Sequence, residues 1–223
     1  MPRRVPCLSR CGVFLTFPLT LAFGSPLIDA VGMRNVLLIC AGSFITGTTL
    51  VITADKLSSG TGVYTIVWVG MLLAGIGWGC SEAVINPLTT TLYPSDKTHK
   101  LSVLHAWWPG GIIIGGLLGE VVRMSDMSWR LKFAFIMAPA LLLLVLLAGA
   151  MFPKTERAAA GIPAKEMLTS ILKPGFLVWF IAMFLTSASE LVPGQWVDFT
   201  LTRTIGISGI WLVIYVAGLM FVM

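Results

Sequence analysis

Long apolar runs, each free of Asp, Glu, Lys and Arg, follow one another along almost the whole chain. The seven runs cover residues 11–28, 35–54, 57–81, 101–119, 133–153, 174–189 and 204–223, and the third and sixth continue past a single Glu to residues 95 and 197. A helix needs about 20 mostly apolar residues to cross a bilayer. None of the runs alternates between apolar and polar residues as the strands of a membrane β-barrel do. The pattern therefore predicts an all-α membrane protein with one transmembrane helix for each run.

Composition supports a multi-pass membrane protein and excludes several other classes. Of the 223 residues, 57% are hydrophobic and 11% are charged, whereas soluble domains carry about 25% charged residues. A soluble core of this size cannot hide so much apolar surface. The net charge of +5 comes from basic residues scattered over short loops, not from a block that would indicate nucleic-acid binding. A soluble enzyme, a disordered chain and a nucleic-acid-binding protein are therefore excluded.

The four cysteines, Cys7, Cys11, Cys40 and Cys80, are expected to be free thiols. Cys7 and Cys11 are spaced as C-x3-C, but no His lies near them to complete a metal site. The sequence therefore predicts neither a disulfide scaffold nor a metal site.

The connection over residues 154–173 is the longest between the runs and the one candidate domain boundary. Seven basic residues are expected on its side of the membrane: Arg34, Lys97, Lys100, Lys154, Arg157, Lys165 and Lys173. Eight are expected on the other side, namely Arg3, Arg4, Arg10, Lys56, Arg123, Arg130, Lys132 and Arg203. Without the three N-terminal arginines the bias favours the long loop as cytoplasmic. A signal peptide would explain those arginines, although the first run continues to Asp29, which favours a retained helix.

A short motif follows the first run. Asp29, Gly32 and Arg34 form the pattern D-x-x-G-x-R, which resembles the cytoplasmic loop between helices 2 and 3 of the major facilitator superfamily. Glycine permits a tight turn, and the carboxylate can accept hydrogen bonds from a neighbouring helix end or pair with an arginine. The resemblance implies a gating motif, although Ser25 and Ala30 stand where the family has Gly and Arg. The alternative is an ordinary polar turn.

A longer stretch carries a narrower resemblance. Residues 75–119 read GIGWGCSEAVINPLTTTLYPSDKTHKLSVLHAWWPGGIIIGGLLG, which is similar to helices 4 and 5 of the fucose/proton symporter-like sugar porters. Residues 128–130 (SWR) resemble the start of helix 6, and Glu190 with Trp196 resembles helix 7. The chain is thus similar to helices 2 to 7 and part of helix 8, with no counterpart of helix 1 or of helices 9 to 12. This pattern suggests a fragment or a mispredicted start.

The resemblance implies a partial bundle in three parts. Residues 1–153 correspond to an N-terminal half bundle that lacks helix 1. Residues 154–173 correspond to the central cytoplasmic loop, and residues 174–223 to the start of the second half bundle.

One face of the third helix carries candidate chemistry. At 100° per residue, Gly75, Gly79, Glu82 and Asn86 fall within about 60° of one another. The glycines permit close approach of another helix, and Pro87 is expected to kink the helix beside Asn86. A charged carboxylate within the bilayer costs about 2.5 to 3.5 kcal/mol on insertion scales, which favours a group that takes up a proton. The resemblance implies a coupling role for Glu82; a structural interhelical hydrogen bond is the alternative.

Two further groups are candidate solute-binding residues. His105 and Trp108 share a face of the fourth helix, where they offer hydrogen bonding and stacking on a sugar ring. Glu190, Gln195 and Trp196 flank a Pro-Gly break, and a broken helix beside a carboxylate is typical of transporter sites. The alternatives are a structural core histidine and an interfacial tryptophan cluster.

These features predict a secondary active transporter that takes up a sugar or another small polar solute together with a proton. The chain has no G-x-S-x-G, H-E-x-x-H or phosphate-binding motif, so neither an enzyme nor a bound cofactor is expected. The expected location is a cell membrane, the inner membrane of a bacterium, and a second chain is a possible partner that completes the bundle. The alternative is a non-transporting membrane subunit or a nonfunctional fragment.

Overall fold

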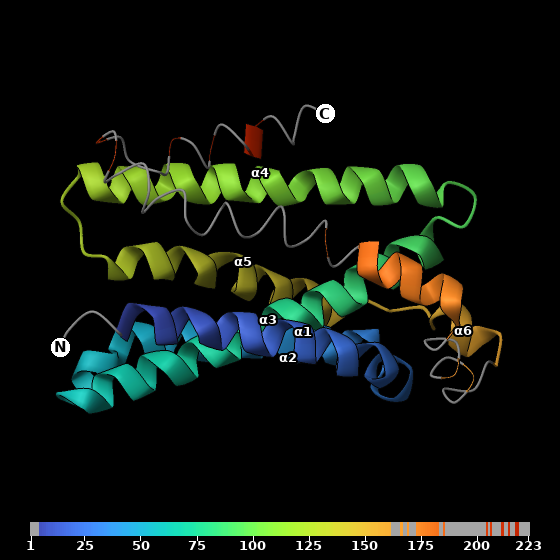
Figure 1. Ribbon diagram of the computed structural model, residues 1–223, viewed down its shortest axis with the longest axis horizontal. Helices are drawn as coiled ribbons and strands as arrows, with labels where there is room; N and C mark the ends of the chain where they lie inside the picture. The colour runs from blue at the N-terminus through green and yellow to red at the C-terminus, as the bar shows by residue number, and fades with distance from the viewer. Residues whose placement is uncertain are drawn as a thin grey trace. The chain divides into compact units, whose positions relative to one another are not determined.

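The computed structural model describes residues 5–161 and 173–182, together with residues 166, 169, 185, 204, 206, 211, 214, 217 and 218. Six helices follow one another in the first of these ranges (Figure 1). They are α1 (Val5–Val31), α2 (Met33–Leu57), α3 (Thr61–Leu92), α4 (Lys97–Met124), α5 (Arg130–Gly149) and the short α6 (Glu156–Ala159). Residues 174–182 are also helical.

The first, second and fourth apolar runs lie within α1, α2 and α4, and α3 and α5 cover most of the third and fifth runs, as predicted. In the described part of the chain, α2, α3, α4 and α5 are long and apolar enough to span a membrane. Two helices begin before their charge-free runs, α4 at Lys97 and α5 at Arg130, whereas α5 ends at Gly149, before the end of the fifth run. The sixth run is helical over 174–182, whereas its remainder and most of the seventh run lie outside the described residues.

The chain forms two compact units. The first unit comprises residues 1–97 and 127–160, and the second comprises residues 98–126 and 161–223. In the first unit, α3 packs against both α1 and α2, and α2 also packs against α5. The long helix α4 belongs to the second unit from Thr98 onward.

The core of the first unit lies where α1, α2, α3 and α5 meet. Helix α2 contributes Met33, Val36, Leu37 and Cys40 at the spacing that places side chains on one helical face. The other members are Ile28 of α1, Cys80, Ala83 and Val84 of α3, and Leu147 of α5. Cys40 and Cys80 are both buried free thiols, as predicted for these two cysteines.

Glycines allow α3 to approach its neighbours closely. A Cβ atom built at Gly47 of α2 would lie 2.5 Å from the carbonyl oxygen of Gly70 of α3, and one built at Gly70 would lie 2.7 Å from the carbonyl oxygen of Gly47. A Cβ atom at Gly79 would lie 2.6 Å from Cβ of Thr20 in α1. The close helix approach predicted at Gly79 is therefore present.

The junction between α1 and α2 is shorter than predicted. The sequence places residues 29–34 in a loop, but α1 continues to Val31 and only Gly32 separates it from α2. Gly32 has φ of +90°, a conformation that glycine adopts without steric cost. Its N–H still donates to the carbonyl of Ile28 at 2.8 Å. Asp29 therefore lies in the last turn of α1, and Arg34 in the first turn of α2.

The predicted central loop also contains an element that the sequence did not predict. Residues 156–159 form α6, whose N-cap is Thr155. The Thr155 hydroxyl accepts a hydrogen bond from the backbone N–H of Ala158 at 3.0 Å, which satisfies a donor that a helix start leaves free.

Candidate functional site

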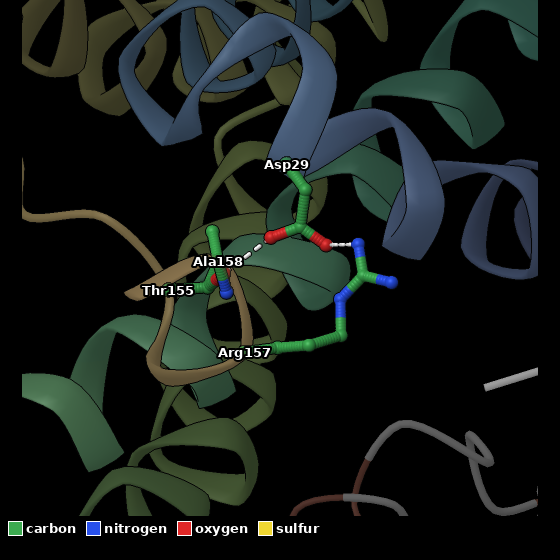
Figure 2. A network of polar contacts seen from close by, with 4 residues as sticks. All are labelled: Asp29, Thr155, Arg157 and Ala158. Carbon is green, nitrogen blue, oxygen red and sulfur yellow. Dashed lines mark hydrogen bonds and ion pairs between the residues drawn. The ribbon is translucent and has the colours of Figure 1, made fainter. Parts of the chain in front are cut away.

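Asp29 has partners far away in the sequence (Figure 2). One carboxylate oxygen, Oδ1, accepts a hydrogen bond from the hydroxyl of Thr155, and the other, Oδ2, pairs with Nη2 of Arg157. The side chains of Asp29 and Arg157 are only 14% and 20% exposed. The predicted gating aspartate is therefore held by the segment that follows α5.

Asp29, Thr155 and Arg157 form one connected network of polar contacts. The Thr155 hydroxyl donates to Asp29 while accepting from the N–H of Ala158, so the cap of α6 and the carboxylate share a side chain. Arg157 follows within the same short helix, and its guanidinium reaches Asp29 from the other side of the carboxylate (Figure 2). The helical turn of α6 thus sets the distance between the two groups that bind Asp29.

Arg34, the basic residue of the motif, binds the end of α5. Its Nε donates to the carbonyl oxygen of Leu147 at 3.0 Å, and its Nη2 to that of Ala148 at 3.5 Å. The last carbonyls of a helix lack intrahelical partners and carry a partial negative charge. The motif therefore joins three chain segments: Asp29 holds α6, Gly32 makes the turn, and Arg34 caps α5.

Further ion pairs connect helix ends within the first unit. Lys97, the first residue of α4, pairs with Glu156 at 2.6 Å, and these side chains are 40% and 50% exposed. Asp55 near the end of α2 pairs with Arg130 at the start of α5. These pairs join the end of α2 to the start of α5, and the start of α4 to α6.

Glu82 and Asn86 lie together on α3, as their spacing predicts. Asn86 Nδ2 donates to Glu82 Oε1 at 3.4 Å, and Asn86 Oδ1 is buried without a hydrogen-bond partner among the described residues. Four of the described acids form ion pairs, but within the described part of the chain Glu82 has no basic partner. Glu82 and Asn86 therefore offer carboxylate and amide oxygens that can accept hydrogen bonds from a neighbouring group.

The other candidate solute-binding residues lie in the second unit or outside the described residues. His105 and Trp108 both lie on α4 of the second unit and are exposed. Pro109 follows them inside the helix, where it removes a backbone donor. Glu190, Gln195 and Trp196 lie outside the described residues.

The sequence analysis did not identify Thr155 and Arg157 as site residues. The available signal was local, because a threonine one residue before a Glu-Arg pair is typical of a helix start. Their distant partner could not be found from spacing, since 126 and 128 residues separate them from Asp29.

The sequence analysis also did not single out Glu120, an acid near the end of α4. Arg123 donates to it through Nε at 2.8 Å.

Within the described part of the chain no group of three or more His, Cys, Asp or Glu side chains is placed to hold a metal ion.

Comparison with known proteins gives a family and two relatives. The sequence profile of the Major Facilitator Superfamily matches residues 11–223. Multidrug resistance protein D of Escherichia coli K12 is 27% identical over 164 residues, which are 70% of this chain and 37% of that protein. A probable metabolite transport protein of Saccharomyces cerevisiae is 30% identical over 130 residues, which are 56% of this chain and 22% of that protein.

The chain thus spans between about a fifth and two fifths of the length of these curated relatives. No solved structure matches it at the same level of significance. The matches confirm the family predicted from the motif at Asp29, and the helices confirm the predicted all-α membrane fold of a partial bundle. The narrower resemblance to the fucose/proton symporter-like porters stays a prediction.

Proposed function

The chain belongs to the major facilitator superfamily, and from this membership we propose that it acts in secondary active transport. The solute is a small polar molecule, in the first place a sugar, and a proton moves with it. The observation that carries the proposal is Glu82, a carboxylate in a membrane-spanning helix with no basic partner among the described residues. Intramembrane acids without a counter-ion are rare and mark proton or substrate paths.

The neighbours of Glu82 support solute binding. Asn86 is within hydrogen-bonding distance of Glu82, and its buried Oδ1 lacks a donor within the described part of the chain. A solute hydroxyl would supply one, and a buried acceptor without a partner costs about 1–3 kcal/mol. His105, Trp108, Glu190, Gln195 and Trp196 are proposed as further solute-binding residues.

The proposed arrangement has the three parts expected from the sequence. Residues 1–153 belong to the first half bundle, residues 154–173 to the central cytoplasmic loop and residues 174–223 to the second half. A second chain that completes the bundle is proposed as a partner, and the proposed location is the inner membrane of a bacterium.

Uptake measurements test the proposal. The chain is placed in membrane vesicles together with any chain that co-purifies with it. An inward proton gradient is imposed, and labelled fucose or a related hexose is added outside. We expect solute to accumulate with the gradient and to equilibrate without it. No gradient-dependent uptake of any sugar or polar solute tested would favour the alternative, a non-transporting subunit or a nonfunctional fragment.

The topology gives a separate prediction. Lys154 and Ser59 are both exposed, and they flank opposite ends of the helices in the first unit. In a background without the native cysteines, we expect Lys154→Cys to react with a membrane-impermeant thiol reagent from the cytoplasmic side and Ser59→Cys from the other side. Lys154 is a better position than the adjacent Thr155, because that hydroxyl is buried against Asp29. Reaction of Lys154→Cys from outside intact cells would reverse the proposed orientation.

The motif at the α1–α2 junction gives a prediction about gating. Asp29→Asn removes the charge that pairs with Arg157 while keeping nearly the same shape. We expect membrane insertion to be unchanged and the uptake rate to fall by about tenfold or more, on the order of the loss from breaking one partly buried ion pair. The measurement is initial uptake per amount of inserted protein, with Glu156→Gln as the control because its pair with Lys97 is exposed. A wild-type uptake rate in Asp29→Asn would show that the motif forms a helix junction and has no role in gating.

A further inference from the structure

We propose that Cys40 of α2 and Cys80 of α3 form a metal site that holds one soft divalent cation, of the class of Hg(II), between their two sulfur atoms. The two-thiol site, defined as Cys40 and Cys80, joins two helices of the first unit. An ion bound there would fasten α2 to α3. The site uses neither Glu82 nor the motif at Asp29, so it is independent of the proposed transport function.

The two thiols meet where α2 and α3 cross closely. A Cβ atom built at Gly77 of α3 would lie 2.9 Å from the ring of Phe44 and 3.1 Å from the carbonyl oxygen of Cys40. Cys80 follows Gly77 by about one helical turn. The side chain of Cys40 interacts electrostatically with Cys80, and both residues belong to the same buried core. One ion at this crossing can therefore reach a sulfur atom of each helix.

The surroundings of the two-thiol site favour a soft cation with few ligands. Cys40 and Cys80 are free thiols that are only 1% and 3% exposed, and Val36 and Val84 of the same core are fully buried. Thiolates select soft metal ions over hard ones. Among the described residues no third His, Cys, Asp or Glu completes a group with them, whereas structural zinc takes four ligands. The site therefore suits an ion that binds two sulfur atoms in a line, as Hg(II) does.

Charge balance selects a divalent ion. When Hg(II) binds, each thiol loses its proton and forms one S–Hg bond, so two protons leave and the complex is neutral. A monovalent soft ion between two thiolates would leave a net negative charge. Charge within a membrane-spanning segment is costly, and α2 and α3 are both long and apolar enough to span a membrane. The neutral bis-thiolate complex is therefore the favoured form.

Ser81 is a positioning residue for the two-thiol site. Its side chain is hydrogen-bonded to the thiol of Cys40, and such a contact orients a ligand before the ion arrives. Loss of a group that orients a metal ligand costs about 10–100-fold in metal affinity. We therefore expect Ser81→Ala to weaken Hg(II) binding by about tenfold while both sulfur ligands remain.

The test measures binding of Hg(II) to the full chain in detergent. Cys7 and Cys11 are replaced by Ser, because their thiols would also bind the ion. The protein is reduced, freed of reductant without oxygen and mixed with HgCl2. We expect one Hg per chain, two sulfur ligands in the X-ray absorption spectrum and protection of both thiols from alkylation. At a hundredfold excess over the Kd, the midpoint of thermal aggregation should rise by about 5–10 °C.

Single variants show whether both sulfur atoms bind the same ion. Cys40→Ser and Cys80→Ser are each expected to weaken Hg(II) binding by more than about a hundredfold, because a ligand is lost rather than reoriented. The parent without Cys7 and Cys11 is the matched control, since it lacks two thiols but keeps the site. If a Ser variant does not yield monodisperse protein, the corresponding Ala variant gives the same comparison. Zn(II) at the same concentration should leave the aggregation midpoint unchanged, because it lacks its four ligands.

Several results would overturn the proposal. They are the absence of Hg(II) binding, wild-type affinity in either single variant, a spectrum with one sulfur ligand, and one Hg shared by two chains. An equal rise of the midpoint with Zn(II) would likewise refute a two-coordinate site. None of these measurements depends on uptake, so they decide the two-thiol site whether or not the chain transports a solute.

Discussion

Glu82→Gln is expected to abolish proton-driven accumulation of the solute while leaving exchange of solute across the membrane. Glutamine has the shape and hydrogen-bonding groups of the protonated acid but cannot release a proton. Binding that needs only a neutral side chain beside Asn86 should therefore survive, since Asn86 lies 3.4 Å from the carboxylate oxygen. Uptake should stop at passive equilibration, because the step that couples solute movement to the proton is missing.

The measurement compares accumulation against a gradient with exchange in proteoliposomes. Glu82→Ala is expected to lose both, because it removes the group that contacts Asn86 and the solute. Asp126→Asn is the control for loss of a negative charge, since Asp126 is exposed in the turn between α4 and α5. Unchanged accumulation in Glu82→Gln would show that the carboxylate is structural and that another group carries the proton.

Gly47→Ala is expected to destabilise the first unit severely. The added methyl group would lie 2.5 Å from the carbonyl oxygen of Gly70, and backbone atoms cannot rotate away as a flexible side chain does. Overpacking of this kind costs about 1–3 kcal/mol when the core can shift. Here α2 and α3 would have to separate along their shared interface. We expect a low yield of monodisperse protein and a lower midpoint of thermal aggregation in detergent.

Gly42→Ala is the matched control on the same helix. Apart from its two chain neighbours and the backbone of its own helix within four residues, no atom in the described part of the structure lies within 4 Å of a Cβ atom built at Gly42. Alanine is favoured over glycine within a helix by about 0.5–1 kcal/mol, so this variant should be as stable as the wild type or slightly more so. Equal aggregation midpoints in Gly42→Ala and Gly47→Ala would contradict the close crossing of α2 and α3.

The long-range partners of the motif explain why part of the candidate site could not be predicted. The sequence identified Asp29 and Arg34 as a gating pattern, but it offered only a general expectation of a helix end or an arginine as partner. The structure supplies Thr155 and Arg157 for Asp29, and the carbonyls of Leu147 and Ala148 for Arg34. More than 110 residues separate each pair, and no local periodicity carries information over that distance.

Helix positions were predictable because the bilayer imposes a local rule. A span must be apolar over about 20 residues and must satisfy its own backbone hydrogen bonds, so runs without charge locate α1 to α5. The rule does not fix the ends. Helix α4 starts at Lys97 and α5 at Arg130, since hydrogen bonding along a helix continues past the apolar stretch into the interface.

The sequence by itself determined the membrane-spanning helices and the shared face of Glu82 and Asn86, because both follow from hydropathy and a fixed helical repeat over a few residues. Only the tertiary structure decided which glycines meet another backbone, as Gly47 and Gly70 do, and which segment holds Asp29. Those features depend on how helices cross and on where distant chain segments return. Apolar helices of nearly uniform hydrophobicity do not encode this in their periodicity, because packing between membrane helices is set by shape and by a few polar contacts.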